Sequence, residues 1–186
     1  MGTRGQALIV VPLIIGAVNV IFALLGCLAL WAFGLPFRLH IPIIMRFAGL
    51  AVLAFGFVFM GWIFKYRRPI DILTSTYLTM RNACMRSADR DSSSMTESLV
   101  FHGPHRHVRH PLYFTVVILF LGWWLLLDYT FLLFMALLFL WWFTVVVIRF
   151  EEQEIRVLFG EEYEDYARKV PMIIPSLRPV VNAIDK

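Results

Sequence analysis

The sequence predicts an all-α protein, a polytopic bundle of four membrane-spanning helices, and two observations carry that prediction. Sixty per cent of its 186 residues are hydrophobic and 16 per cent are charged, whereas soluble domains are roughly 45–50 per cent apolar and about 25 per cent charged. Three apolar runs are each long enough to cross a bilayer, which takes about 20 residues. This composition excludes an ordinary soluble domain, a disordered chain and a disulfide scaffold.

The first two spans are expected at Ala7–Phe33 and Ile43–Phe64. The first run is too long for a signal-peptide core, so it is interpreted as a retained span. Gly34, Pro36 and Pro42 indicate a short turn between the two spans. A run of basic residues ends the second span.

An additional helix is expected at Ile70–Met85, because apolar residues recur there at spacings of three and four. Pro69 suits its first turn. This amphipathic helix is predicted to lie on the membrane interface, or to be a short helix packed on the protein or a fifth membrane helix. The Ser-rich stretch Ser87–Ser98 is expected to be mobile.

The third apolar run, Leu112–Ile148, contains a single charged residue, Asp128. One straight helix of that length would measure about 55 Å, far more than a bilayer. The run is therefore predicted to form a helical hairpin that turns at Asp128–Thr130. Its arms are short, so they are expected to pack inside the protein or to be extended by flanking polar turns.

The positions of lysine and arginine predict the orientation of the bundle. Fifteen of the 17 basic residues lie in the N-terminus, the segment 65–109 and the tail after residue 148, and only Arg38 and Arg46 remain for the other side. Four spans with both termini in the cytoplasm satisfy this distribution. The short chain suggests a prokaryotic plasma membrane.

Four of the five histidines lie within nine residues just before the third apolar run: His102, His105, His107 and His110. A metal site is not expected, because prolines interrupt the segment and no cysteine is near. The alternatives are a basic surface that contacts lipid headgroups and a polar rim that binds a polar or anionic cofactor at a helix entrance.

A second polar concentration follows the last apolar run. Residues 149–160 have helical spacing with Gly160 as a C-cap, and a second short helix is expected to end before Pro171. Both are predicted to be short cytoplasmic helices. Glu151 and Glu152 lie at the membrane boundary, where an ionised carboxylate costs several kcal/mol unless it has a partner. Arg156 lies four residues after Glu152 and could pair with it.

Together the two concentrations resemble the membrane methyltransferases that include isoprenylcysteine carboxyl methyltransferase and the phospholipid N-methyltransferases. The resemblance covers roughly the last 90 residues. It rests on Leu99-Val100, Gly103-Pro104 and Val108-Arg109-His110-Pro111-Leu112-Tyr113, followed by Glu151-Glu152, Ile155, Phe159-Gly160, Tyr163, Tyr166, Val170-Pro171 and Pro175. The chain departs from the family where His105 replaces the usual tyrosine and Thr115 a small residue. The resemblance implies an N-terminal two-span part, residues 1–98, and a C-terminal catalytic part, residues 99–186.

The family binds S-adenosylmethionine, and the resemblance implies a pocket for it in the C-terminal part. Arg109 suits its carboxylate, and Glu151 or Glu152 suits its ammonium or ribose hydroxyls. His110 and Tyr113 can donate to the adenine or stack on it. The segment His102–Gly103 is assigned to the same pocket, and S-adenosylhomocysteine is the expected product.

The methyl acceptor implied by the resemblance is lipophilic and enters from the bilayer. Arg149 or Arg156 could position an anionic acceptor, while Glu151, Glu152 or His105 could deprotonate an amine. A soluble thiol or small amine remains open. Four tryptophans of the hairpin could line a lipid tunnel or simply pack between helices: Trp123, Trp124, Trp141 and Trp142.

Two other classes of function remain open. One is a membrane reductase that uses NADPH, since sterol reductases resemble this family in their C-terminal half. The other is a non-enzymatic membrane scaffold. No nucleic acid partner is expected.

Overall fold

The structure, a computed structural model, describes residues 3–84 and 102–178, and no strand occurs among them. The elements are α1 (Thr3–Ala32), α2 (Ile43–Tyr66), α3 (Pro69–Cys84), a short 3-10 helix η2 (Gly103–Arg106), α4 (Pro111–Leu127), α5 (Thr130–Trp142), a π-helical turn η3 (Phe143–Val147) and α6 (Ile148–Lys169). The predicted mobile stretch 87–98 and the predicted boundary at residue 98 lie outside the described residues.

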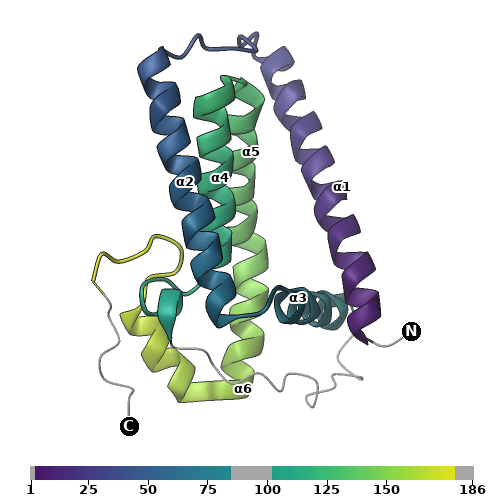
Figure 1. The fold of residues 1–186 in the computed structure, drawn as a ribbon. Helices are drawn as coiled ribbons and strands as arrows, with labels where there is room; N and C mark the ends of the chain where they lie inside the picture. The colour runs from purple at the N-terminus through teal and green to yellow at the C-terminus, as the bar shows by residue number, and fades with distance from the viewer. Residues whose placement is uncertain (1–2, 85–101, 179–186) are drawn as a thin grey trace.

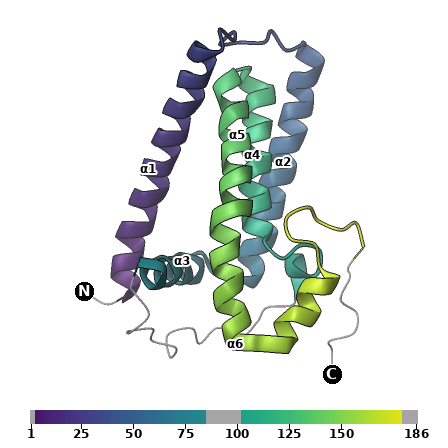
Figure 2. The same cartoon turned by 180° about the vertical axis from the view of Figure 1, so that it is seen from behind.

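Four long helices run side by side, with α4 and α5 at the centre, α2 against α4 and α1 against α5 (Figures 1 and 2). Within the described part of the chain, three helical stretches are long and apolar enough to cross a membrane: Thr3–Ala32, Ile43–Tyr66 and Thr130–Lys169. The fourth, α4, is apolar but shorter. The all-helical membrane bundle is therefore confirmed in its general form.

Close contact between α2 and α4 depends on glycines. A Cβ on Gly49 would lie 2.8 Å from the backbone nitrogen of Leu126, and a Cβ on Gly122 would lie 2.9 Å from the Leu53 side chain. Small residues let helix backbones approach closely in a membrane, where packing rather than hydrophobicity drives association. This contact fixes how the second half of α4 lies against α2.

The helical hairpin turns where the sequence predicts. α4 ends at Leu127 and α5 begins at Thr130, with Asp128 in a left-handed conformation (φ 61°). The Asp128 side chain is buried and accepts hydrogen bonds from the backbone N–H groups of Leu39 (3.1 Å) and Ile41 (3.2 Å). This aspartate therefore joins the α4–α5 turn to the α1–α2 connection.

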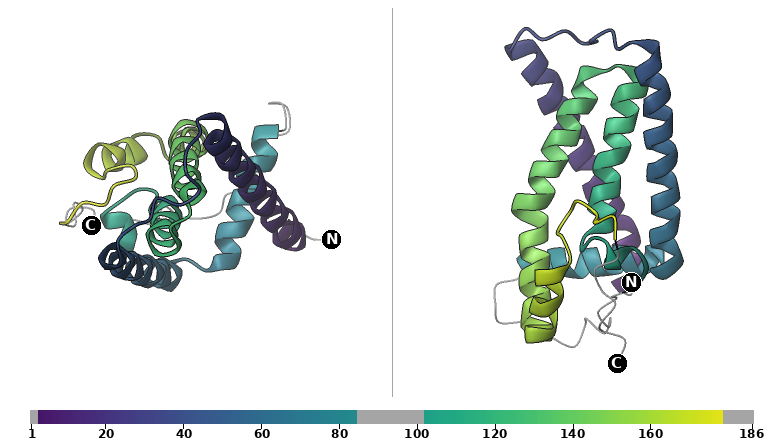
Figure 3. Two further views of the ribbon diagram at one scale, coloured as in Figure 1. Left: turned by 90° about the horizontal axis from the view of Figure 1, so that it is seen from above. Right: turned by 90° about the vertical axis from the view of Figure 1, so that its left-hand side faces the viewer.

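The helix α3 lies across one end of the bundle rather than along it (Figures 1 and 3). It begins at Pro69, as predicted, and packs on α1, where the Tyr77 hydroxyl donates to Gln6 Oε1 at 3.1 Å. Its direction fits the predicted interfacial or packed helix and not a fifth span. The start of α1, α3 and α6 all lie at this end.

The helix predicted over residues 149–160 is present, and it is continuous with the last span. The helix continues from α5 through the π-helical turn into α6, and the first break in helical geometry comes at Gly160 (φ 50°). Backbone hydrogen bonds carry the helix past the point where the sequence turns polar, because helix continuity does not require apolar side chains. Only the segment after Gly160 forms the short terminal helix that was expected.

The hairpin tryptophans do not line one tunnel. Trp123 and Trp141 are exposed on the outside of the bundle. Trp142 packs into an aromatic core, with ring centroids 5.8 Å from Phe22 and 5.6 Å from Phe143. This arrangement favours packing and lipid contact.

Candidate functional site

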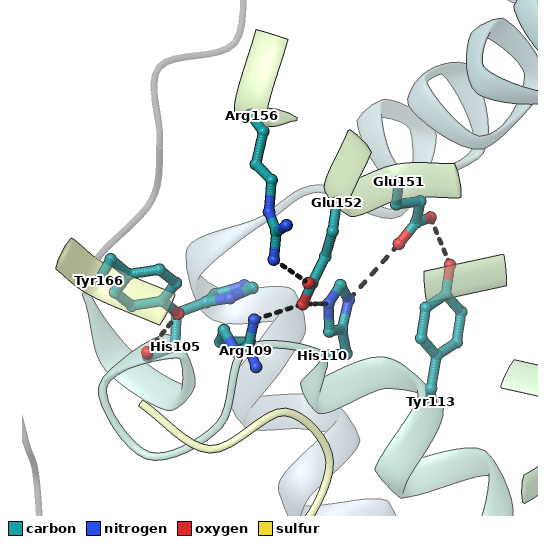
Figure 4. A network of polar contacts seen from close by, with 8 residues as sticks. All are labelled: His105, Arg109, His110, Tyr113, Glu151, Glu152, Arg156 and Tyr166. Carbon is teal, nitrogen blue, oxygen red and sulfur yellow. Dashed lines mark hydrogen bonds and ion pairs between the residues drawn. The ribbon is translucent and has the colours of Figure 1, made fainter. Parts of the chain in front are cut away.

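Two segments some 40 residues apart meet at the end of the bundle that carries α3. The residues just before α4 come from one side, and the first turns of α6 come from the other. The α4–α5 hairpin reverses the chain between them, so Arg109, His110, Glu151 and Glu152 converge (Figure 4). Pro111 is the first residue of α4, and it therefore fixes the position of Arg109 and His110, which directly precede the helix.

Glu152 is the centre of this cluster. It is 9 % exposed. Its Oε1 lies 2.5 Å from Arg109 Nη1 and 3.3 Å from His110 Nε2, and its Oε2 lies 3.4 Å from Arg156 Nη2 (Figure 4). The pairing with Arg156 confirms the expectation from their spacing. A buried carboxylate is thus surrounded by three groups that can carry positive charge.

Glu151 completes the cluster on the other side of His110. The Tyr113 hydroxyl donates to Glu151 Oε1, and His110 Nδ1 lies 3.5 Å from Glu151 Oε2. Burial alone would lower the pKa of His110, but hydrogen bonds and charges from the two glutamates outweigh it and raise that pKa above its usual value. The His110 ring therefore bridges two carboxylates, and both stabilise its protonated form.

Aromatic rings support the cluster from the side of the bundle. The Tyr113 ring stacks on His110, with centroids 5.7 Å apart, and on Phe143, with centroids 4.5 Å apart. Phe143 belongs to the π-helical turn that leads into Glu151. The packing of α4 against this turn thus sets the position of both glutamates.

A segment after α6 holds the backbone of the cluster. The N–H of Arg109 donates to the Pro171 carbonyl (2.9 Å), and the N–H of His110 donates to the Met172 carbonyl (3.1 Å). Further along, the N–H of Ser176 donates to the His107 carbonyl (2.9 Å). This pairing could not be predicted from the sequence, because only the tertiary fold brings these segments together.

Two tyrosines after Gly160 close the other flank. Tyr163 and Tyr166 are buried, and the Tyr166 hydroxyl donates to the His105 carbonyl at 2.8 Å (Figure 4). Both matched the family pattern, but no role was assigned to them. The two tyrosines lie three residues apart on an otherwise polar helix, and this spacing indicates that they share a buried face.

The remaining predicted site residues are placed apart from the Glu152 contacts. Burial, together with the nearby Arg67 charge, lowers the pKa of His105 to about 4, although a hydrogen bond to the Arg109 backbone opposes this. Arg149 is exposed and has no ion pair with the described residues. His102 is exposed, and Gly103 has a positive φ and packs where a Cβ would lie 2.6 Å from the Tyr66 ring.

Among the described residues no group of three histidine, cysteine, aspartate or glutamate side chains is arranged to hold a metal ion. His107 instead contacts the segment after α6, where its Nδ1 is 2.8 Å from the Ser176 carbonyl oxygen. The cluster instead presents a guanidinium, two carboxylates and a stacked aromatic pair. Arg109 Nε is buried and has no hydrogen-bond partner among the described residues.

Comparison with known proteins agrees with the resemblance seen in the sequence. The model of the family described as "phospholipid methyltransferase" matches residues 44–162. The methanethiol S-methyltransferase of Crocosphaera subtropica is 39 % identical over 75 residues, which cover 38 % of this chain and only 27 % of that relative. No solved structure matches.

Proposed function

The chain belongs to the phospholipid methyltransferase family, and from that premise we propose that it is an integral membrane methyltransferase. In this proposal it transfers a methyl group from S-adenosylmethionine to an apolar or membrane-borne acceptor. α1, α2, α4 and α5 each cross the membrane, and both termini and the pocket face the cytoplasm. The excess of basic residues in the segments near the cluster supports this orientation.

The observation that carries the proposal is the cluster of Arg109 and Glu152 with His110 between two carboxylates. The amino-acid part of S-adenosylmethionine has one carboxylate and one ammonium. Arg109 offers buried donors, including an unpartnered Nε, for the carboxylate. Glu152 can accept from the ammonium or a ribose hydroxyl, and the His110–Tyr113 stack provides an aromatic surface for the adenine.

When bound, S-adenosylmethionine supplies an electrophilic methyl group on a sulfonium. The residues of this chain bind and orient the methyl donor and the acceptor, and they exclude water. These are the main contributions a protein makes to such a displacement. A carboxylate or thiolate acceptor arrives with its charge and needs no base. An amine acceptor must lose a proton. Glu151 lies in the cluster beside His110 and Tyr113 and could take that proton, whereas His105 lies apart from the Glu152 contacts.

A thiol is a second candidate acceptor. The 39 % identical relative is named for methyl transfer to methanethiol, and its match to this chain supports testing small thiols beside prenylcysteines and lipid amines. A thiolate would use the same Arg109 and Glu152 contacts to the methyl donor. The two candidates differ only in the acceptor, so both predict the same cofactor binding.

The test is calorimetric titration of detergent-purified protein with S-adenosylhomocysteine, with NADPH as the competing ligand. Wild type is expected to bind S-adenosylhomocysteine, and Arg109→Ala is expected to lose at least about hundredfold in affinity, because a buried charge loses its partner. Arg38→Ala is the matched control, since Arg38 lies at the other end of the bundle and contacts Tyr129. Binding of NADPH instead would replace the methyltransferase proposal with the reductase.

A further inference from the structure

A second concave site lies outside the cluster, between α2 and the segment that follows α6. It is a groove of about 340 Å³. One wall is formed by side chains of α2, and the other by residues 175–177. His107 connects the walls: its ring lies 5.7 Å from the Trp62 ring, and its Nδ1 lies 2.8 Å from the Ser176 carbonyl oxygen.

Both walls of the groove carry exposed apolar side chains. Val58 is 73 % exposed on the wall formed by α2, and Leu177 is fully exposed on the other wall. α2 is long and apolar enough to cross a membrane, and in a bilayer Val58, near its middle, would meet acyl chains rather than water. Arg109, by contrast, contacts Glu152 of α6.

Two cationic residues lie close in the chain to residues that line the groove, one of them on the next turn of α2. Lys65 follows Trp62 by three residues, and Arg178 directly follows Leu177; both are exposed. An apolar groove open to acyl chains, with a lysine and an arginine close in the chain to its lining residues, matches the chemistry of an anionic phospholipid. The acyl chain would fill the groove while the phosphate reaches the two cations.

We propose that this groove binds one anionic phospholipid, and that the lipid supports the backbone of the cluster. The segment that forms the outer wall also accepts hydrogen bonds from Arg109 and His110 through Pro171 and Met172. A lipid packed against residues 175–177 therefore limits the motion of the chain that holds both side chains. This proposal does not depend on methyl transfer.

The first test is native mass spectrometry of the detergent-purified protein with added phosphatidylglycerol. Val58→Trp fills the groove, and Val20→Trp is the matched control, because Val20 is 60 % exposed on α1 and does not line the groove. Wild type and Val20→Trp should each retain one phosphatidylglycerol, and Val58→Trp should bind it about tenfold more weakly. Equal retention by all three proteins would overturn the site, as would a bound molecule whose mass is not that of a phospholipid.

The second test measures amide hydrogen exchange at Arg109, His110 and Ser176 in nanodiscs of phosphatidylglycerol. Protection of these amides should fall in Val58→Trp and stay at the wild-type level in Val20→Trp. Unchanged protection in Val58→Trp would overturn the link to the cluster. Lys65→Ala should remove the preference for phosphatidylglycerol over phosphatidylcholine, and a preserved preference would contradict the assigned headgroup contact.

Discussion

The two ends of the bundle each bury a carboxylate beside an arginine, but they hold it in different ways. At the end with α3, the partners of Glu152 are all side chains: Arg109, His110 and Arg156. At the opposite end, Asp128 is 1 % exposed and is held by two backbone N–H groups, with Arg46 at 3.8 Å. One carboxylate is bound by groups that can rotate, and the other by groups that cannot.

This difference fits the binding role proposed for Glu152 and a structural role for Asp128. A backbone N–H is fixed by the chain that carries it, so Asp128 can leave its partners only if the α1–α2 connection moves. Side-chain donors can exchange one carboxylate for another without moving a helix. The side-chain partners of Glu152 therefore fit the binding role proposed for it, whereas Asp128 completes a turn, as the further bond from Thr130 Oγ1 to the Pro36 carbonyl (2.8 Å) also indicates.

The largest effect is expected from removing the charge of Glu152. Glu152→Gln should lower the affinity for S-adenosylhomocysteine about hundredfold, because a buried charge that pairs with the ligand ammonium is lost, a change of about 3 kcal/mol. Calorimetry measures this directly. Asp128→Asn, which also removes one buried charge, should leave the affinity of the folded protein unchanged. Equal losses of affinity in both variants would erase the distinction between the two ends.

Asp128→Asn should act on stability instead. An asparagine presents one acceptor oxygen and one NH2 donor, so the N–H of Leu39 or of Ile41 loses its acceptor. An unsatisfied buried donor costs about 1–3 kcal/mol, and a lower free energy of unfolding in mixed micelles would measure it. A variant as stable as wild type would contradict the role of Asp128 in joining the two turns.

Much of the fold could be predicted from the sequence because it depends on local signals. The hairpin at Asp128 follows from an apolar run too long for one span, and the start of α3 from Pro69. The continuation of α5 into α6 could not be predicted in the same way. Composition changes at Arg149, but the backbone hydrogen bonds of the helix do not, and only Gly160 interrupts them.

The candidate site was predictable in its residues and not in its geometry. The family pattern pointed to Arg109, His110 and the two glutamates, and the hairpin implied that they share one end of the bundle. The backbone pairing with Pro171 and Met172 is a long-range contact that leaves no local pattern. For Asp128, the sequence indicated a turn, but its acceptor role depends on a connection almost 90 residues earlier.

Acid should lower the stability of the folded protein through His105. Its pKa of about 4 in the folded protein is below the usual 6.5, so the unfolded chain binds a proton first as the pH falls. The contribution to stability is present above pH 6.5 and is lost as the pH falls toward 4. Between pH 7 and 4.5, wild type should lose about 2 kcal/mol more than His105→Gln. The free energy of unfolding of both proteins at the two pH values measures this difference. Equal losses in wild type and His105→Gln would show that His105 is protonated in the folded protein as readily as in the unfolded chain.

The smallest effect is expected from replacing Arg156, the most exposed of the three partners of Glu152. The Arg156 side chain is 52 % exposed and lies 3.4 Å from Glu152, so water and salt screen the pair. Exposed ion pairs typically contribute about 0.2–1 kcal/mol, so Arg156→Ala should change the S-adenosylhomocysteine affinity less than about fivefold. The residual effect should shrink further at high salt, whereas the loss in Arg109→Ala should persist because Arg109 is 13 % exposed. If Arg156→Ala lost as much affinity as Arg109→Ala, Arg156 would contact the ligand itself. The proposed binding site would then extend from the buried pair of Arg109 and Glu152 to the surface of α6.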